Sequence, residues 1–249
     1  MNTFDLERLL LAAWPARETT SLHGWTVLTD GGVTGRPNAV SPLAFHGKLG
    51  EAIAAVQSHY TARHMRPTFR IARGACAPVD LPEVLISHGW KPTQETLVMT
   101  APLADALSRL PSVEGVVLSE TCPPAVDAII RETSASAVEY EERRGLALRT
   151  PHPRAFAMIG DSDNAQAIGL SVIVEGQAAV FLMRTHPAHR RKGLARRVLA
   201  GLLGWARNNG ATGAFLQVEA DNKPAVSLYE AAAFKSVYSY DYWREETIP

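Results

Sequence analysis

The stretch HRRKGLARRVL, residues 189–199, places five Arg and Lys side chains around a single glycine, Gly193. Apolar residues then recur at the spacing of a helix with one buried face: Leu194, Val198, Leu199, Leu202, Leu203 and Ala206. Gly210 follows the run, where a glycine commonly ends a helix. We therefore expect a helix that begins just after Gly193, with basic residues in its first turn and in the bend before it.

This basic bend predicts an anion site. The N-terminal end of a helix already carries partial positive charge, so basic groups crowded there repel one another unless an anion binds among them. A glycine lets the backbone approach a ligand, and free N–H groups at a helix start bind phosphate. The preceding strand, AAVFLMRT, ends just before Pro187, and strand ends are where open α/β sheets bind ligands. A solvated basic helix face is the simpler alternative.

The composition favours a globular protein and disfavours a nucleic-acid partner. Of 249 residues, 46% are hydrophobic and 20% are charged, and Lys plus Arg equals Asp plus Glu at 25. Asp5 and Glu7 interrupt the N-terminal apolar run, and no stretch approaches the ~20 apolar residues of a membrane helix. Cys76 and Cys122 stand far apart. We expect a cytoplasmic protein with reduced thiols, without metal, nucleic-acid or membrane partners.

The order of predicted elements indicates an α/β fold with a mixed sheet. Strand-like runs from residue 154 onward are joined first by a turn at 161–164 and a hairpin at 175–177, and later by helices. The last four elements are predicted at residues 194–209 (helix), 214–219 (strand), 224–232 (helix) and 235–243 (strand). Hairpins followed by helix-separated strands predict a mixed β-sheet flanked by helices.

Two segments share one pattern and suggest a decayed duplication. VLISHGWKPTQETLVM (84–99) and LYEAAAFKSVYSYDYW (228–243) both run from a helical stretch through a small residue, an aromatic and a lysine into a strand. A long amphipathic helix and a strand precede each segment. We therefore predict two domains, residues 1–110 and 111–249, each with a central mixed sheet and flanking helices.

The second half resembles the GNAT superfamily of acyl-CoA-dependent N-acyltransferases. Residues 190–195, RRKGLA, fit the phosphate motif Arg/Gln-x-x-Gly-x-Gly/Ala, and Asn222, LYE at 228–230 and Ala233-Phe234 fit the downstream signature. The match covers residues 165–243 and extends more loosely back to Gly115. The first half resembles a degenerate copy, because Leu85 stands opposite Tyr229 and FHGKLGEA lacks the motif spacing.

The resemblance implies an N-acetyltransferase that transfers an acetyl group from acetyl-CoA to a primary amine by direct attack in a ternary complex. The alternative is a catalytically inactive, CoA-responsive binding or regulatory module. The amine acceptor is a small molecule or a protein, and the sequence does not determine the oligomeric state. The resemblance implies these cofactor-binding residues: Met183, Arg184, Thr185, Arg190, Arg191, Lys192, Gly193, Leu194, Ala195, Arg196, Asn222, Ala225 and Tyr229.

Tyr229 is the predicted general acid. A phenol with an ordinary pKa of ~10 is well matched to a departing thiolate, although a helical tyrosine can simply pack in the core. Asn222 is also placed to cap the next helix. Glu219, at the end of a strand, is the predicted general base, with Asp221, Glu175 or a water chain as alternatives.

Two further stretches bear on the acceptor without identifying it. Glu139, Glu141 and Glu142 attract a cationic amine or form a solvated helix face. The glycine-rich segment GGVTGRPNAVSP, residues 31–42, contains one Arg and one Asn, and its role is left open.

Overall fold

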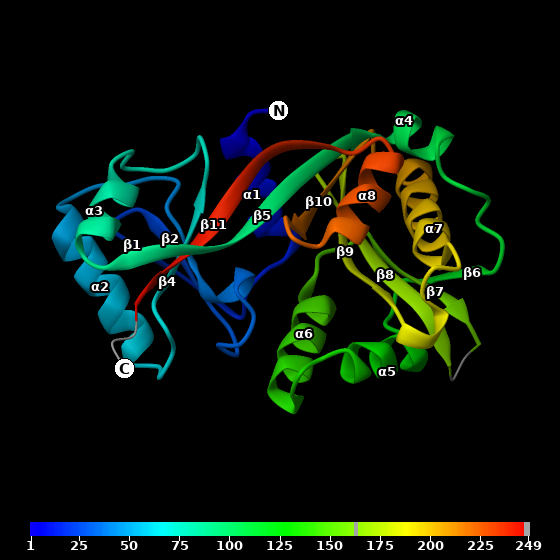
Figure 1. Cartoon of the computed structure of the whole chain (residues 1–249), viewed down its shortest axis with the longest axis horizontal. Coiled ribbons are helices and arrows are strands. Elements are labelled where there is room, and N and C mark those ends of the chain that lie inside the picture. Colours follow the sequence, from blue (N-terminus) through cyan, green and yellow to red (C-terminus); the bar gives the residue numbers. More distant parts are fainter. Residues whose placement is uncertain (162–163, 247–249) are drawn as a thin grey trace.

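The computed structural model describes residues 1–161 and 164–246, and its eleven strands form one continuous mixed sheet with helices on its faces (Figure 1). The strand order is β1-β2-β3-β4-β11-β5-β10-β9-β8-β7-β6. The predicted α/β class with a mixed sheet is confirmed. Ser162 and Asp163 of the predicted turn at 161–164 lie outside the described residues.

The first half of the chain contributes five strands. They are β1 (Glu18–Leu22), β2 (Trp25–Thr29), β3 (Val40–Ser41), β4 (Thr68–Ala72) and β5 (Trp90–Pro102). Its helices are α1 (Thr3–Ala13), the 3₁₀ turn η1 (Arg36–Asn38), α2 (Leu49–Thr61), α3 (Leu81–Ser87) and α4 (Leu103–Ser108).

The second half contributes six strands. They are β6 (Val116–Ser119), β7 (Arg154–Gly160), β8 (Ala165–Val174), β9 (Gln177–Thr185), β10 (Gly213–Glu219) and β11 (Lys235–Glu245). Its helices are α5 (Pro124–Glu132), α6 (Ala137–Arg149), η2 (Pro187–His189), α7 (Leu194–Asn208) and α8 (Lys223–Ala231). The last four elements predicted from the sequence are confirmed to within two residues at each end.

The two halves exchange their last strands. β5, the last strand of the first half, pairs antiparallel with β10 of the second, with Met99 opposite Leu216. β11, the last strand of the second half, pairs antiparallel with β4 of the first, with Phe69 opposite Trp243. β5 and β11 also pair with each other and run together between the two lobes in Figure 1, so that β11 ends beside α2 and α3. Each half therefore completes the sheet of the other.

The strand exchange affects the predicted domain boundary between residues 110 and 111, because β5 precedes this boundary but packs in the second half. Met99 and Ala101 of β5 pack in the same hydrophobic cluster as Val198 and Leu202 of α7. Strands that precede the division thus belong to the core of the second half. The boundary itself stays a prediction.

The backbone supports the predicted duplication at the start of the exchanged strands. Gly89 and Ala233 both adopt left-handed conformations, with φ of 80° and 64°, and each precedes a buried aromatic residue, Trp90 or Phe234. Leu85, in the position corresponding to Tyr229, is completely buried and carries no polar group. The two units thus keep the same chain path while differing in the chemistry available at this position.

A buried ion pair of the first half is connected to the second half by a hydrogen bond from Tyr238. Arg70 of β4 donates hydrogen bonds to both carboxylate oxygens of Glu7 on α1, and the two side chains are 3% and 0% exposed. Tyr238 of β11 donates to the same carboxylate at 2.6 Å. One acidic side chain therefore holds together a helix and a strand of the first half and the exchanged strand of the second.

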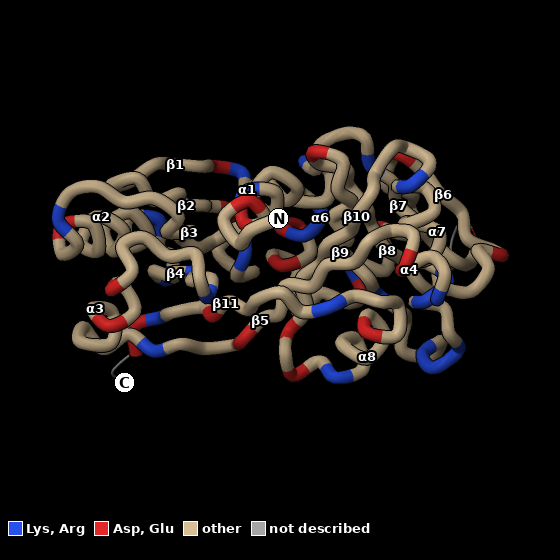
Figure 2. The backbone as a smooth tube through the Cα atoms, turned by 90° about the horizontal axis from the view of Figure 1, so that it is seen from above, with Lys and Arg blue, Asp and Glu red and all other residues tan. Residues whose placement is uncertain are grey.

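Basic and acidic residues are interspersed along most of the backbone (Figure 2). The long blue stretch beside α7 and α8 stands out from this mixture, as the run at residues 190–192 predicts. None of the described helices is both long and apolar enough to cross a membrane.

We expect Arg70→Met to reduce the free energy of unfolding by ~3–5 kcal/mol, because it leaves the buried Glu7 carboxylate without its cation. The matched control is Arg73→Met, which removes an exposed arginine paired with Glu95 and Asp241 and should cost ~0–1 kcal/mol. Urea unfolding measures both. Equal losses would show that the buried pair contributes no more to stability than an exposed one.

Candidate active site

β9 and β10 diverge in the middle of the sheet. They pair in parallel from Gln177 and Gly213 as far as Val180 and Leu216, and then both continue without pairing to each other. A bulge forms at this point in β9, where Leu182 adopts a φ of 51° and the register with β8 shifts. The divergence leaves edge N–H and C=O groups of two buried strands facing a common space.

The basic bend lies between the end of β9 and the start of α7. Arg191 and Gly193 adopt left-handed conformations, with φ of 62° and 76°. Among the described residues, no hydrogen-bond acceptor faces the backbone N–H groups of residues 191–195. The first turn of α7 also contains no acidic residue. Five successive unpaired N–H groups at a helix start form the kind of concave donor surface that binds phosphate.

The basic side chains divide into two groups around this bend. Arg190, Arg191 and Lys192 are exposed. Arg196 donates to the carbonyl oxygen of Arg109 at 2.7 Å, and Arg197 donates to that of Glu114. The second pair thus fastens α7 to the segment after α4, while the first group stays available to a ligand. A direct role of the Arg196 side chain toward CoA remains a prediction.

A cavity of about 620 Å³ opens where the strands diverge. Six of the residues predicted for the site line it: Met183, Arg184, Glu219, Asn222, Ala225 and Tyr229. Thr185 and the bend at residues 190–195 are not among its lining residues. The basic bend is therefore separate from the cavity, which contains the predicted catalytic groups.

Tyr229 lies on α8 with its ring against Phe234 and is 7% exposed. Burial raises the pKa of its phenol to about 12, and the positive charge of Arg36 opposes this shift. Tyr229 was predicted either to act as the general acid or to pack in the core. Its ring does pack in the core, and the residue also lines the cavity. The phenol stays protonated at neutral pH and can donate a proton.

Asn222 is the N-cap of α8, as predicted. Its side-chain oxygen accepts a hydrogen bond from the N–H of Ala225 at 3.3 Å. Such a cap satisfies one of the free donors at a helix start. Both residues also line the cavity, so capping and a ligand contact are compatible.

Glu219, at the end of β10, is exposed and lines the cavity, where its carboxylate accepts a hydrogen bond of 2.7 Å from Gln94 of β5. The alternative bases lie elsewhere. Glu175 forms an ion pair with Arg8 of α1, which lowers the pKa of this carboxyl. Asp221 is in the turn before α8 and is not among the lining residues.

The first half of the chain forms the opposite wall of the cavity. Trp14 and the segment from Val33 to Pro37 line it, together with Tyr242 of the exchanged strand β11. The Cζ atom of Arg36 lies 5.9 Å from the centre of the Phe181 ring on β9. The glycine-rich segment therefore delivers a cation to the site, a role that the sequence left open.

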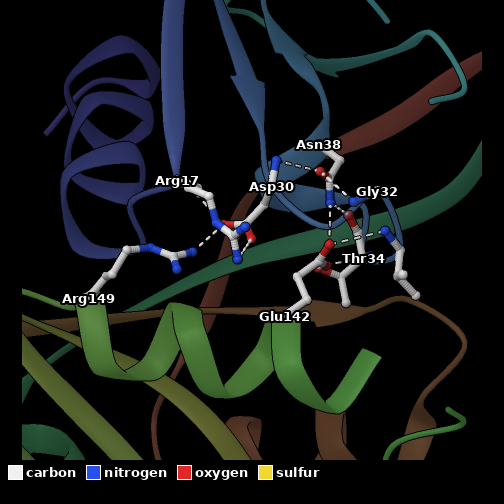
Figure 3. Close-up of polar contacts among 8 residues, drawn as sticks. Arg17, Asp30, Gly32, Thr34, Asn38, Glu142 and Arg149 are labelled. Atoms are coloured by element: carbon white, nitrogen blue, oxygen red, sulfur yellow. Dashed lines mark hydrogen bonds and ion pairs between the residues drawn. The ribbon is translucent and has the colours of Figure 1, made fainter. Parts of the chain in front are cut away.

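The carboxylate of Glu142 on α6 holds this segment in place (Figure 3). It accepts hydrogen bonds from the N–H groups of Val33 and Thr34 at 3.1 and 2.7 Å, and from the Asn38 amide at 3.0 Å. Glu142 is 2% exposed. Of the two alternatives for the acidic cluster, a solvated helix face is wrong for Glu142, because its charge is buried against backbone donors.

A second carboxylate, this one from the first half of the chain, binds an arginine of α6. Asp30, the residue before this segment, accepts hydrogen bonds from the N–H of Arg17 at 2.9 Å and from the guanidinium of Arg149 on α6 (Figure 3). Asn38 accepts from the N–H groups of Asp30 and Gly32. The segment and α6 are thus joined by one buried acid from each side.

Arg36 was not predicted as a site residue, and Glu142 was considered only as a group that attracts an amine or faces solvent. The available signal was the glycine-rich composition of residues 31–42. At Gly35 the ring of Tyr242 approaches so closely that a Cβ atom would lie 2.5 Å from its Cζ. This approach, between residues more than 200 positions apart, could not be inferred from local sequence.

Neither cysteine is suited to nucleophilic chemistry at neutral pH. Burial, reinforced by nearby acidic residues, raises the pKa of Cys76 to about 12 and that of Cys122 to about 11. Neither residue lines the cavity. The thiolate is the reactive form of cysteine, and these positions disfavour it.

Comparison with known proteins agrees with the fold. Residues 4–243 match the family described as "Probable histone acetyltransferase Rv0428c C-terminal". "Uncharacterized N-acetyltransferase YobR" of Bacillus subtilis (strain 168) is 27% identical over 240 residues, which are 95% of this chain and 96% of that protein.

Two solved structures share the arrangement over nearly all of the chain. A GCN5-related N-acetyltransferase from Kribbella flavida has a TM-score of 0.69 at 17% identity and covers 96% of this chain and 93% of its own. A tandem GNAT protein from the clavulanic acid biosynthesis pathway has a TM-score of 0.63 at 18% identity, and the match covers 100% of this chain and 89% of that protein. At these identities the structures show the fold alone. With the match over residues 4–243, the chain belongs to the family of this description, and it has the fold of the tandem GNAT protein.

Proposed function

We propose that this protein transfers an acetyl group from acetyl-CoA to a primary amine by direct attack in a ternary complex. The observation that carries the proposal is the bend before α7, whose free N–H groups lie next to the divergence of β9 and β10. Bound acetyl-CoA would supply an activated thioester. All other requirements of the reaction fall to residues of the chain.

The bend would hold the pyrophosphate of CoA. The N–H groups of residues 191–195 are donors, and Arg191 and Lys192 add positive charge to the positive end of the α7 dipole. The edge of β9 beyond Val180, including Met183 and Arg184, would bind the pantetheine arm and polarise the acyl carbonyl through a backbone N–H.

Two cavity residues would transfer protons. Glu219 accepts a proton from the amine, directly or through water, as the amine nitrogen forms a bond to the acyl carbon. Tyr229 donates its proton to sulfur as the carbon–sulfur bond breaks, which its protonated state at neutral pH supports. The products are an N-acetylated amine and a free thiol, and no acyl-enzyme is needed.

We expect the double variant Arg191→Ala/Lys192→Ala to raise the Kd for CoA roughly tenfold or more, because it removes charge-assisted contacts to the pyrophosphate. Arg207→Ala, which removes an exposed charge from the last turn of α7, is the control and should not change the Kd. Calorimetric titration with CoA measures both. An unchanged affinity in the double variant would contradict the phosphate assignment.

Tyr229→Phe should lower kcat by roughly 10²-fold or more while the Kd for CoA stays the same, because only proton donation is lost. Release of free thiol measures the rate, and a wild-type protein that binds CoA without any release would support the inactive-module alternative.

The pH profile provides an independent test of Tyr229. Because its pKa is raised to about 12, the phenol stays protonated as the pH rises through ~10, the ordinary tyrosine value. An alkaline loss of kcat centred near ~10 that disappears in Tyr229→Phe would contradict this assignment.

Direct attack predicts that the variant Cys76→Ala/Cys122→Ala keeps the wild-type rate of acetyl transfer. Both thiols are held protonated at neutral pH, outside the cavity. Mass spectrometry of the wild type mixed with acetyl-CoA alone should show no acetylated cysteine. Loss of turnover in a folded variant would indicate a covalent intermediate.

A further inference from the structure

The cavity beside Tyr229 has more positive than negative charge on its walls. Four arginines line it, Arg36, Arg143, Arg184 and Arg244, against two acids, Glu139 and Glu219. Glu139 is already engaged by the guanidinium of Arg143 at 2.5 Å. Among the described residues, no carboxylate lies within ion-pair distance of Arg36 or Arg184. Arg244 also lacks an acidic partner, but its Nε donates a hydrogen bond to the hydroxyl of Thr68. Among the described residues, Arg36 and Arg184 are therefore the two cavity cations with neither an acidic partner nor a side-chain hydrogen bond.

Arg184 is partly buried. Its Nε atom is shielded from solvent and has no hydrogen-bond partner among the described residues. Burial and the neighbouring charges of Arg143 and Arg36 lower the pKa of its guanidinium to about 10, although Glu139 opposes the shift. A buried donor without an acceptor is costly, and an anion placed here would satisfy it.

Arg36 reaches the same space from the other half of the chain. It is the first residue of η1, and the turn before it is held by Glu142 through the N–H groups of Val33 and Thr34. Its guanidinium lies over the ring of Phe181, the first residue of β9 beyond its pairing with β10. The cation is therefore fixed by contacts to the second half.

This charge lies apart from the predicted phosphate site. The bend at residues 190–195 is outside the cavity lining, so the phosphates of CoA have a donor surface of their own. The cavity cations are thus left for the other substrate.

We propose that the amine acceptor carries a carboxylate that binds between Arg36 and Arg184, so that this enzyme acetylates small carboxylate-bearing amines of the amino-acid or short-peptide class. The inference rests on the proposed function. Guanidinium groups match carboxylates by paired hydrogen bonds, and a planar anion between two of them also relieves their mutual repulsion. A lysine-rich protein segment would instead add positive charge to the cavity. Arg36, supplied by the unit without a CoA motif, becomes a specificity residue.

The test compares acceptors that differ only in charge. Dipeptides with a free C-terminal carboxylate are assayed beside the same dipeptides as C-terminal amides and beside an oligolysine peptide, with release of free thiol as the readout. We expect the wild type to prefer the free carboxylates. In Arg36→Gln their kcat/KM should fall roughly ten- to a hundredfold, through the acceptor KM, as expected when a charge-assisted hydrogen bond is lost.

Several controls separate specificity from damage to the fold. In Arg36→Gln the amides should lose much less kcat/KM than the free carboxylates, and Arg36→Lys should recover part of the preference. Arg63→Gln removes an arginine of the same half that pairs with Glu18 outside the cavity lining, and should match the wild type. Equal use of carboxylate and amide by the wild type, or a preference for oligolysine, would overturn the proposal.

Glu142 provides a second variant, because it positions Arg36 without lining the cavity. Glu142→Gln should reduce the ratio of carboxylate to amide turnover, whereas simple destabilisation would lower both rates equally. An unchanged ratio would contradict its positioning role.

A binding measurement tests the carboxylate site separately from the proposed acetyl transfer. Calorimetric titration of the same dipeptides into the CoA-bound protein should show a carboxylate preference that is lost in Arg36→Gln. That result supports the anionic acceptor site even if no amine is turned over, in which case only the proposed transfer fails. No preference in binding would overturn the inference itself.

Discussion

The exchange of β5 and β11 is the constraint on which the rest of the structure depends. Each strand lies between the other and a strand of the opposite half, so neither sheet is complete without the partner unit. The buried charge of Glu7 is stabilised only when α1, β4 and β11 are all in place. The two units therefore form one continuous scaffold, and a cavity between them can be shaped by residues from both.

That scaffold gives the two units different tasks. The second unit holds the divergence of β9 and β10, the bend before α7, and Tyr229. The first unit, in which Leu85 replaces the tyrosine, contributes the turn that carries Arg36. A copy that lacks the motif for CoA can thus still form a wall of the acceptor cavity.

The predictions succeeded where short-range pattern determines structure. The apolar stripe after Gly193 placed α7 within one residue at its end, and the shared pattern at 84–99 and 228–243 corresponds to matching left-handed turns at Gly89 and Ala233. The motif at 190–195 forms a bend with free N–H groups. The acidic cluster was interpreted less well, because periodicity does not show whether Glu142 faces water or the donors of a distant turn.

The sequence by itself determined the fold class, the bend that begins α7 and the identity of the tyrosine on α8, because backbone conformation and helix periodicity are set by neighbouring residues. Only the tertiary structure decided which strands pair across the two halves, and that Arg36, Arg184 and Tyr229 share one cavity. These relations join residues up to about two hundred positions apart. They arise from packing and from the burial of charge, which no local pattern encodes.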